Sequence, residues 1–391
     1  MISLERMRRL DAWIGWPLAT LLGFLPRKAR LLPASPQRIV IVKLSGIGSL
    51  LVCAGVLRAL RRSQPQARIM VVALEGPAAA ARLLSEVDEV MVISTASPWT
   101  LVRDGFRALR KLRQQRADVI ADIEYFSRLS TLFCALSGAR FRLGFGLPAW
   151  WRRRLIDGGT AFCEESHFCA CVARLLQPLG VDEQQLPAVT LALPVPAEAA
   201  AEALLAAESG GTTGTTWMAV NPHAAELCVQ RRWPLERFAE VADALLRRHP
   251  ELRIAIPGTA DERERAERLR TLIPAERRSR VSNLAGRTDL ATLAAVLRRC
   301  RLVLTNDTGV MHLAAAMGSP LVALFGPESP VRYGPVGTGR VHVFCGAAPC
   351  GPCLNYSNRK RAPCGEEPAA CLLAIPVTEV RSCCEAELEN R

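Results

Sequence analysis

The sequence predicts an α/β protein with two doubly wound parallel sheets, and three features favour that class. Short apolar runs alternate with helical stretches from Arg38 to Ile123, and a second such series begins at Met218. Between them lies SGGTTGTT, Ser209–Thr216, which is typical of a flexible linker. Alternation of strands with helices favours parallel sheets whose helices cover both faces.

The first series begins with a buried-type strand, Arg38–Lys43, and a loop that contains Gly46 and Gly48. An alanine-rich helix, Pro194–Ala207, follows the series. The other strands are expected at residues 68–74, 89–93 and 118–123, and the helices at residues 50–62, 77–85 and 100–115.

The second series continues the same alternation up to residue 305. Its strands are expected at residues 218–221, 253–257, 280–283 and 301–305, and its helices at residues 235–248, 261–272 and 289–298. The predicted division is 38–208 for a first domain, 209–216 for the linker, 217–335 for a second domain and 336–391 for a cysteine-rich C-terminal segment.

The composition is both apolar and basic. The chain has 391 residues, of which 50 % are hydrophobic, so it is long enough for two sizeable cores. With 50 basic and 37 acidic residues the formal net charge is +13, which suits a phosphorylated glycan, an anionic membrane or a nucleic acid. Nucleic acid is the least favoured partner, because the sequence has no nucleic-acid-binding motif and few aromatic residues.

Residues 1–30 stand apart from the two series. Basic residues flank an apolar run, Ala12–Pro26, which is too short to span a bilayer and is interrupted by Pro17. A secretory signal would have a small-residue cleavage site after this run, where the chain has basic residues instead. Trp13 and Trp16 suit a membrane interface, so we expect an amphipathic helix and a cytoplasmic protein that lies on the inner face of the membrane. The alternative is a helix packed on the protein's own surface.

The segment Thr305–Pro327, TNDTGVMHLAAAMGSPLVALFGP, is typical of a strand end, a turn, a helix and a buried strand. A helix that begins on Asp-Thr-Gly directs free backbone N–H groups and the positive end of its dipole toward an anion. His312, in the first helical turn, adds a polar contact. The alternative is that Asp307 only caps the helix.

This segment closely resembles the nucleotide-sugar signature of glycosyltransferase family 9, the heptosyltransferases of lipopolysaccharide synthesis. The resemblance extends over roughly residues 38–380. It implies the GT-B architecture, in which two Rossmann-like domains face a cleft, and a nucleotide-sugar donor similar to ADP-heptose. It also implies which residues bind the donor diphosphate: Asp307, Thr308, Gly309 and His312.

Two further segments resemble the donor side of that family. Asn221-Pro222-His223-Ala224, followed by Arg231-Arg232-Trp233-Pro234, is similar to a strand–loop–helix segment usually close to NPGAS and KRWP. The resemblance implies that Asn221 binds the donor and that Arg231, in place of a lysine, neutralises the leaving diphosphate. It also places Glu262 at the donor ribose. The alternatives are a surface arginine and acidic residues that only favour the start of a helix.

The loop Lys43–Ser49, KLSGIGS, resembles the family's K-x-S-x-x-G-D, with Lys43, Ser45 and Gly48 in matching positions. The resemblance implies that this loop borders the acceptor. The family's last residue is an aspartate that acts as general base, whereas this chain has Ser49. A serine of ordinary pKa is a poor proton acceptor, and no acid occurs between Lys43 and Ala73. The base therefore lies elsewhere, or the reaction runs without a strong base, or activity is lost.

The nearest candidate base lies in DVIADIEYF, Asp118–Phe126, at the end of a predicted strand. Asp122 and Glu124 are two residues apart on an extended segment, so both are expected to point to one face. Ligands of such sheets bind at this edge. We predict Glu124 as the general base, Asp122 as a supporting residue and Arg128 as a ligand of an acceptor phosphate or carboxylate. The alternative is an Asp122 that only makes loop hydrogen bonds and a solvated Glu124.

Four cysteines near the C-terminus have the pattern CxxC-x10-C-x6-C: Cys350, Cys353, Cys364 and Cys371. This spacing predicts a tetrathiolate site for Zn or Fe. The metal would be structural, because a saturated S4 site leaves no position for substrate. The alternative is free thiols or a redox pair. No catalytic metal is expected, because helix dipoles and an arginine can carry the diphosphate charge.

Together these features predict an inverting glycosyltransferase that moves a heptose-like sugar from a nucleotide sugar to a lipid-linked or lipopolysaccharide-core acceptor at the inner membrane. One alternative is an NDP-sugar epimerase of similar fold, which would bring its own catalytic acids. Another is a degenerate family member that binds nucleotide sugar or assembles with an active transferase. Ser49 supports this last alternative.

Overall fold

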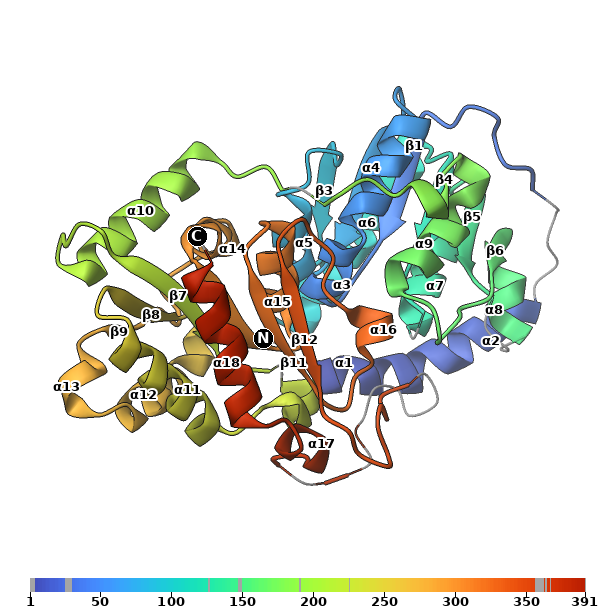
Figure 1. The fold of residues 1–391 in the computed structure, drawn as a ribbon. Coiled ribbons are helices and arrows are strands. Elements are labelled where there is room, and N and C mark those ends of the chain that lie inside the picture. Colours follow the sequence, from blue (N-terminus) through green and yellow to red (C-terminus); the bar gives the residue numbers. More distant parts are fainter. Residues whose placement is uncertain are drawn as a thin grey trace. The chain divides into compact units, whose positions relative to one another are not determined.

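The computed structural model describes residues 4–24, 30–125, 127–146, 150–189, 191–224, 226–355, 362, 364–365 and 367–390. The chain divides into two compact units, Met1–Pro187 and Ala188–Arg391. Figure 1 shows a sheet with helices around it in each unit. Each sheet has six strands, and neighbouring strands pair in parallel. The predicted fold class, α/β with two doubly wound parallel sheets, is confirmed.

In the first unit the strand order is β3-β2-β1-β4-β5-β6. Residues Ile39–Val42 are buried, as expected for a strand covered on both faces. Val42 lies opposite Asp122 of the neighbouring strand, so the residues that follow these two strands meet at one edge of the sheet. The strands are β1 Arg38–Val42, β2 Arg68–Ala73, β3 Glu89–Val92, β4 Val119–Asp122, β5 Phe141–Phe145 and β6 Gly158–Thr160.

Helices connect these strands and pack around the sheet. The longest, α6, begins with a capping box formed by Ser97 and Thr100 and has Pro98 in its first turn. The helices are α3 Ile47–Val52, α4 Ala54–Ser63, α5 Glu75–Ala81, α6 Pro98–Gln115, α7 Arg128–Leu136, α8 Trp150–Leu155 and α9 Phe168–Leu176, and short 3₁₀ turns follow at η2 Gln177–Leu179 and η3 Glu183–Gln185.

The N-terminal segment forms one helical run, in which a π-helical turn joins two α-helical parts. The three parts are α1 Leu4–Leu10, η1 Asp11–Gly15 and α2 Trp16–Phe24. The inner side of α2 packs on α7 and α8, where Ala19 joins a buried cluster with Leu132, Trp151 and Leu155. The predicted helix is therefore present and packs on the protein's own surface. None of the helices in the described ranges is long and apolar enough to cross a membrane.

In the second unit the strand order is β12-β11-β10-β7-β8-β9. Its strands are β7 Thr216–Asn221, β8 Leu252–Ile256, β9 Val281–Asn283, β10 Leu302–Asn306, β11 Leu321–Phe325 and β12 Val341–Cys345. Its α-helices are α10 Val195–Ser209, α11 Leu235–Arg248, α12 Arg263–Leu272, α13 Ala275–Arg278, α14 Leu290–Arg299, α15 Gly309–Ala316, α16 Pro330–Tyr333, α17 Ala370–Leu373 and α18 Val377–Glu389, with 3₁₀ turns at η4 Glu226–Arg231 and η5 Ala260–Glu262.

The two units divide earlier in the chain than the predicted linker at 209–216. Helix α10 packs against α14, and Arg299 donates to Glu198 at 2.6 Å, so α10 belongs to the second unit. The segment 336–391 also belongs to this unit and is not an appendage. Strand β12 pairs with β11, while Val380 and Cys384 of α18 lie in the core that α11 helps to form.

Candidate active site

Lys43 and Glu124 form a buried ion pair at the C-terminal edge of the first sheet. Lys43 directly follows β1 and Glu124 lies two residues beyond β4. The Nζ atom of Lys43 donates to Oε1 of Glu124 at 2.8 Å, and both side chains are buried. Ser45 adds its backbone N–H at 2.7 Å and its hydroxyl at 3.2 Å to the same oxygen. Glu124 is therefore not solvated, which excludes one alternative from the sequence.

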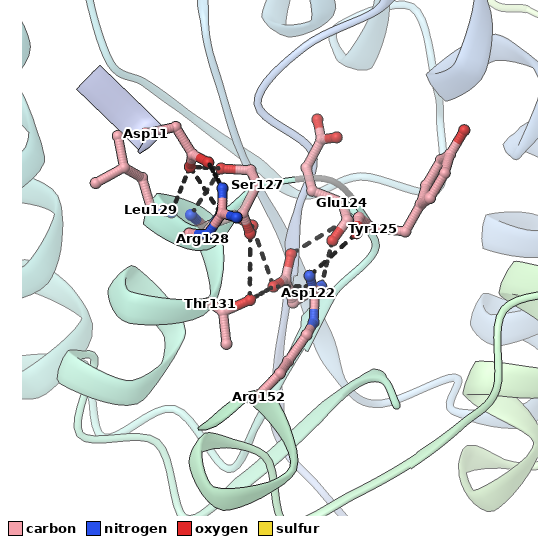
Figure 2. A network of polar contacts seen from close by, with 10 residues as sticks. Asp11, Asp122, Glu124, Tyr125, Ser127, Arg128, Leu129, Thr131 and Arg152 are labelled. Atoms are coloured by element: carbon pink, nitrogen blue, oxygen red, sulfur yellow. Dashed lines mark hydrogen bonds and ion pairs between the residues drawn. The ribbon is translucent and has the colours of Figure 1, made fainter. Parts of the chain in front are cut away.

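The second oxygen of Glu124 is in a different situation. Among the residues that the structure describes, no donor contacts Oε2. Figure 2 shows the carboxylate of Glu124 pointing away from the contacts made around Asp122. A carboxylate that is fixed through one oxygen and open at the other has the arrangement that a general base needs.

Asp122 is a fully buried carboxylate with its own set of partners (Figure 2). Its Oδ2 accepts from Thr131 at 2.7 Å, from Ser130 at 3.1 Å and from Arg152 at 3.2 Å. Its Oδ1 accepts the backbone N–H of Glu124 at 3.2 Å. Burial raises the pKa of Asp122 to about 6, and the pairing with Arg152 opposes that rise. The two carboxylates have different partners, and that of Glu124 points away from those of Asp122, so the expectation that both point to one face is wrong. Asp122 accepts the backbone N–H of Glu124 and so fixes the backbone that carries it.

Ser49 lies in the first turn of α3 and has no acidic partner among the described residues. Its hydroxyl donates to the carbonyl of Gly46 at 2.9 Å. Gly46 has a φ of +83°, and a Cβ atom there would come within 2.5 Å of the Ser49 hydroxyl. The glycine thus permits this tight loop. Gly48 is buried inside α3.

Arg128 is the first residue of α7 and contacts the N-terminal helix. Its guanidinium Nη1 lies 3.2 Å from Oδ2 of Asp11. The other oxygen of Asp11 accepts the backbone N–H groups of Arg128 at 2.7 Å and Leu129 at 2.8 Å, as Figure 2 shows. Asp11 therefore satisfies the start of α7 and neutralises part of the charge predicted to bind an acceptor anion.

In the second unit, Asn221 at the end of β7 connects two threonines of the neighbouring β10–α15 segment. Its Nδ2 donates to Thr305 and Thr308, both at 2.9 Å. Thr308 occupies the N-cap position of α15, but its side chain makes no capping hydrogen bond. The helix, whose first residue is Gly309, thus begins without a side-chain cap, which leaves N–H groups for an anion. His312 is buried in the first turn.

Asp307 and Arg231 pair with each other. Nη1 of Arg231, at the end of η4, lies 3.2 Å from Oδ2 of Asp307. Asp307 thus has an ion-pair partner in place of the capping contact named as the alternative, and Arg231 is paired with it rather than lying alone on the surface; their roles in donor binding stay predictions. The two predicted donor residues form one group at the start of α15.

Several buried polar atoms near these residues lack a protein partner. Within the described ranges, no hydrogen bond reaches Oδ1 of Asn221, Nε of Arg231 or either ring nitrogen of His223. Buried polar atoms are normally paired, because an unpaired one loses its hydration without compensation. Their convergence at the C-terminal edge of the sheet marks a place where a polar ligand can supply the missing bonds.

Glu262 lies at the end of η5, beside the same edge. Its Oε2 accepts the backbone N–H of Thr259 at 2.8 Å as part of a capping box. A Cβ atom on Gly258 would lie 3.2 Å from this oxygen, so the carboxylate packs closely against Gly258. The structure thus gives Glu262 a capping role, and its predicted contact with the donor ribose stays a prediction.

Sequence comparison identifies the family of this chain. The model of glycosyltransferase family 9 (heptosyltransferase) matches residues 160–362. The chain belongs to glycosyltransferase family 9. Lipopolysaccharide heptosyltransferase 2 of Salmonella typhimurium is 26 % identical over 315 residues, which cover 75 % of this chain and 84 % of that protein. Lipooligosaccharide heptosyltransferase 2 of Haemophilus influenzae is 39 % identical over 111 residues, 28 % of this chain and 31 % of that one.

A solved family 9 glycosyltransferase from Veillonella parvula has the same fold. The TM-score is 0.74 at 22 % identity, over 93 % of this chain and 99 % of that one. The two Rossmann-like units are thus those of GT-B enzymes, as predicted. The family 9 chain is a glycosyltransferase, and the family assignment favours transfer over the epimerase alternative.

The four predicted metal cysteines of this family 9 chain lie in one neighbourhood. Burial and the nearby thiols of Cys364, Cys350 and Cys371 raise the pKa of Cys353 to about 11. Cys353 also donates its backbone N–H to Pro327, which ends the donor signature. Among the described residues, no three His, Cys, Asp or Glu side chains are arranged to hold a metal ion. In the described part of the chain these thiols therefore lie near one another, but their arrangement is not that of a metal site.

Sequence reasoning missed two residues of this site. Arg152 is 1 % exposed and binds Asp122, but in WWRRRL it resembles a surface basic run. The available signal was its place beside Trp151 and three residues before Leu155, which are both buried. His223 stands where the NPGAS-like motif has glycine, and this departure from the motif could have drawn attention to the residue.

Proposed function

We propose that this glycosyltransferase transfers a heptose-like sugar, with inversion at C1, from an ADP-heptose-like donor to a lipopolysaccharide-core acceptor. The observation that carries the proposal is the convergence of unpartnered buried polar atoms with the uncapped start of α15. The names of the related heptosyltransferases support the same substrate class.

In the proposed donor complex the diphosphate binds at the start of α15, through the residues that the family signature implies: Asp307, Thr308, Gly309 and His312. The free N–H groups and the helix dipole favour the anion. Arg231 exchanges part of its pairing with Asp307 for the leaving phosphate. Because these groups carry the charge, the reaction proceeds without a catalytic metal.

In the proposed reaction an acceptor hydroxyl attacks the sugar C1 atom. A bond forms between the acceptor oxygen and C1, and the bond between C1 and the phosphate oxygen breaks. The nucleoside diphosphate leaves with the electron pair. The hydroxyl proton moves to Oε2 of Glu124, while Lys43 and Ser45 hold Oε1 in place.

Substitution of Glu124 tests the base. We expect Glu124→Gln to lower kcat by about 10²- to 10⁴-fold and to leave donor affinity unchanged. Ser49→Ala is the matched control on the same edge and should retain the parent rate. Ser49→Asp in the Glu124→Gln background places a carboxylate where the family has its base and should restore part of the rate. Unchanged transfer by Glu124→Gln would remove Glu124 from the reaction.

A donor screen tests the function as a whole. Binding of ADP-heptose, UDP-, GDP- and TDP-hexoses is measured by calorimetry, and transfer to heptose-free lipopolysaccharide core is followed by mass spectrometry. Binding and transfer of the ADP-linked sugar are expected. Binding without transfer of any of these sugars would favour the degenerate, assembly-partner alternative, for which Ser49 is the supporting observation.

We propose further that the N-terminal helix holds the enzyme on the cytoplasmic face of the inner membrane. The N-terminal helix exposes Trp13 by 80 %, Trp16 by 56 % and Phe24, whose ring also packs on Trp150, by 70 %. Such aromatic side chains favour the headgroup region of a bilayer. Exchange of all three for serine should abolish co-sedimentation with anionic vesicles, whereas Leu272→Ser, an exposed apolar residue of the second unit, should not. Equal sedimentation of both variants would contradict the proposal.

For the cysteine cluster we propose a structural tetrathiolate Zn or Fe site, with these ligands: Cys350, Cys353, Cys364 and Cys371. Four thiolates are suitable ligands for either metal. The metal would hold the loops of the C-terminal segment together and would take no part in catalysis. The purified chain should carry close to one Zn or Fe per molecule by elemental analysis. Cys353→Ser should remove it, and Cys300→Ser, a buried thiol elsewhere, should not. Metal-free protein of normal stability would contradict the proposal.

A further inference from the structure

Helix α6 presents three large apolar side chains to solvent. Trp99 is 71 % exposed, Val102 50 % and Phe106 68 %. They are spaced by three and four residues, so they lie together on one side of the helix, here called the α6 face. The opposite side packs in the core of the first unit through Ala108 and Leu112. The packing of this helix therefore leaves an apolar face in water, which is typical of an interaction surface.

The start of α6 is held firmly by the loop that precedes it. Oε1 of Glu75 accepts the Ser94 hydroxyl at 2.8 Å and the backbone N–H of Thr95 at 2.7 Å. The capping box then fixes the first turn of the helix, in which Trp99 lies. An exposed aromatic side chain on so rigid a backbone loses little conformational freedom when it binds, which favours binding.

This start of α6 lies at the same edge of the first sheet as Lys43 and Glu124. Strand β3 is parallel to the other strands, so the loop after Val92 leaves the sheet where β1 and β4 also end. The edge carries the proposed general base, and ligands of such sheets bind at this edge. A bilayer bound beside it would bring a lipid-linked acceptor close to Glu124.

The helix that carries the apolar face is also basic. Among its 18 residues are five basic residues and one acidic residue, Asp104. Asp104 is already paired with Arg103, whose Nε donates to it at 2.9 Å. Arg107 is 71 % exposed, and Arg110 is exposed one helical turn after Phe106. Exposed arginines beside exposed aromatic side chains are typical of a helix that binds an anionic bilayer.

The size of the α6 face favours a bilayer over a protein partner. A stable protein interface takes about 20–30 residues from each side, whereas this face consists of three large apolar side chains. Three such side chains are sufficient for shallow insertion at the headgroup level, which tryptophan favours in particular. A contact of this size is weak alone and gains affinity from a second contact on the same molecule.

The N-terminal helix can supply that second contact. Met7 of α1 and Leu101 of α6 pack on one core cluster, to which alternate residues of β1, Val40 and Val42, contribute. Alternate residues of a strand point to the same side, so α1 and α6 cover the same face of the first sheet. The two exposed aromatic surfaces thus belong to one layer of the first unit.

We propose that the α6 face, with Arg107 and Arg110 beside it, is a second membrane contact that binds an anionic phospholipid bilayer. The inference rests on the proposed function, because it assumes an acceptor that is embedded in the membrane. The three apolar side chains insert at the headgroup level while the arginines bind lipid phosphate. The contact orients the edge of the sheet that carries Glu124 toward the lipid surface.

Co-sedimentation of the full chain with vesicles measures this contact. The vesicles consist of phosphatidylcholine with phosphatidylglycerol, or of phosphatidylcholine alone. The triple variant Trp99→Ser, Val102→Ser, Phe106→Ser should bind the anionic vesicles about tenfold or more weakly than the parent chain. The matched control is Leu272→Ser with Val331→Ser, two exposed apolar residues of the second unit, and it should bind as the parent does.

The charge and the location of the contact are tested separately. Arg107→Gln with Arg110→Gln should weaken binding to the anionic vesicles and leave binding to the neutral vesicles unchanged. Photoreactive benzoylphenylalanine in place of Phe106 should crosslink to phosphatidylglycerol, whereas the same group in place of Leu272 should not. This readout does not depend on the folding of the triple variant, and absence of a crosslink at Phe106 would contradict the proposal.

The outcomes separate the α6 face from the other proposals. If the parent chain binds the anionic vesicles and the triple variant binds them equally well, the α6 proposal is wrong and attachment by the N-terminal helix stands. If the triple variant only lowers the molecular mass in light scattering, the face is an interface between proteins, and the proposal is again wrong. If the parent chain binds no vesicles, both membrane proposals are wrong, while ADP-heptose binding and transfer to core still test the proposed reaction.

Discussion

Arg152 and Asp122 form an ion pair that is almost completely removed from solvent. The Nη2 and Oδ2 atoms are 3.2 Å apart, and the side chains are 1 % and 0 % exposed. The same guanidinium donates to the carbonyls of Glu124 and Tyr125. One arginine therefore fixes the carboxylate that ends β4 and the loop that carries the proposed base.

Loss of Arg152 should destabilise the first unit. In Arg152→Met the carboxylate of Asp122 stays buried without its cation, which costs about 3–5 kcal/mol of unfolding free energy. Arg152→Lys keeps the charge but cannot make the three forked contacts, so its effect should be intermediate. Urea unfolding measures both. The exposed neighbour offers the control, since Arg153→Met should change stability by less than about 0.5 kcal/mol; equal effects at both positions would contradict this account.

Asp11 should control the attachment of the N-terminal helix. In Asp11→Ala two backbone N–H groups at the start of α7 lose their acceptor, which weakens the cap by about 1–2 kcal/mol. Hydrogen exchange should rise at Arg128 and Leu129 and along residues 4–24. Asp11→Asn keeps an oxygen acceptor without the charge and should show a smaller rise. Unchanged protection of both amides in the alanine variant would argue against the capping role.

His223 should make the folded state sensitive to acid. Its pKa is about 3 when folded, mainly because of burial, against an ordinary value of 6.5 for histidine, so below pH 6.5 the unfolded chain binds a proton that the folded chain does not. The contribution to stability is complete above pH 6.5 and is lost progressively as the pH falls toward 3. At pH 5 the loss amounts to about 2 kcal/mol. His223→Asn should lose correspondingly less stability than the parent between pH 7 and 5 in urea unfolding, and parallel curves would contradict the prediction.

Arg231 should act mainly on the rate of transfer. In Arg231→Met the leaving diphosphate loses its cation, so kcat should fall by about 10²- to 10³-fold with a smaller change in the KM for the donor. Arg231→Lys, which has the residue type usual in the family, should retain more of the rate. Steady-state kinetics with Arg247→Met, an exposed arginine of α11, supply the control. If Arg231→Met instead raised the KM for the donor strongly at constant kcat, Arg231 would contribute to donor binding alone.

The periodicity of the sequence was sufficient to predict the order of most strands and helices, because parallel strands are apolar on both sides and helices separate them. The position of the linker was not predictable in this way. The glycine-rich stretch at 209–216 has the composition of a linker, but α10 before it is held to α14 by Glu198 and two arginines, Arg298 and Arg299. Ion pairs between residues so far apart in the chain cannot be recognised from the local sequence around either residue.

Local motifs predicted the elements around the candidate site better than they predicted which side chains pair there. The helix that begins at Gly309 was predicted from its motif, although the structure gives it no side-chain cap. The pairing of Glu124 with Lys43 does not, because it depends on the adjacency of β1 and β4, which are far apart in the chain. Periodicity also misdirected one expectation, since Asp122 ends a strand and Glu124 already lies beyond it.

The π-helical turn at Asp11–Gly15 sets the rotation of the two parts of the N-terminal helix. An α-helix advances by about 100° per residue, so one extra residue in a wide turn shifts everything after it by that angle. The turn allows Asp11 to reach α7 while Ala19 still reaches Trp151. A one-residue deletion within 12–14 would convert the turn to α-helix and rotate Ala19 away from its cluster. The length of this short segment is thus as constrained as its composition, and insertions or deletions in it should be tolerated far less well than substitutions.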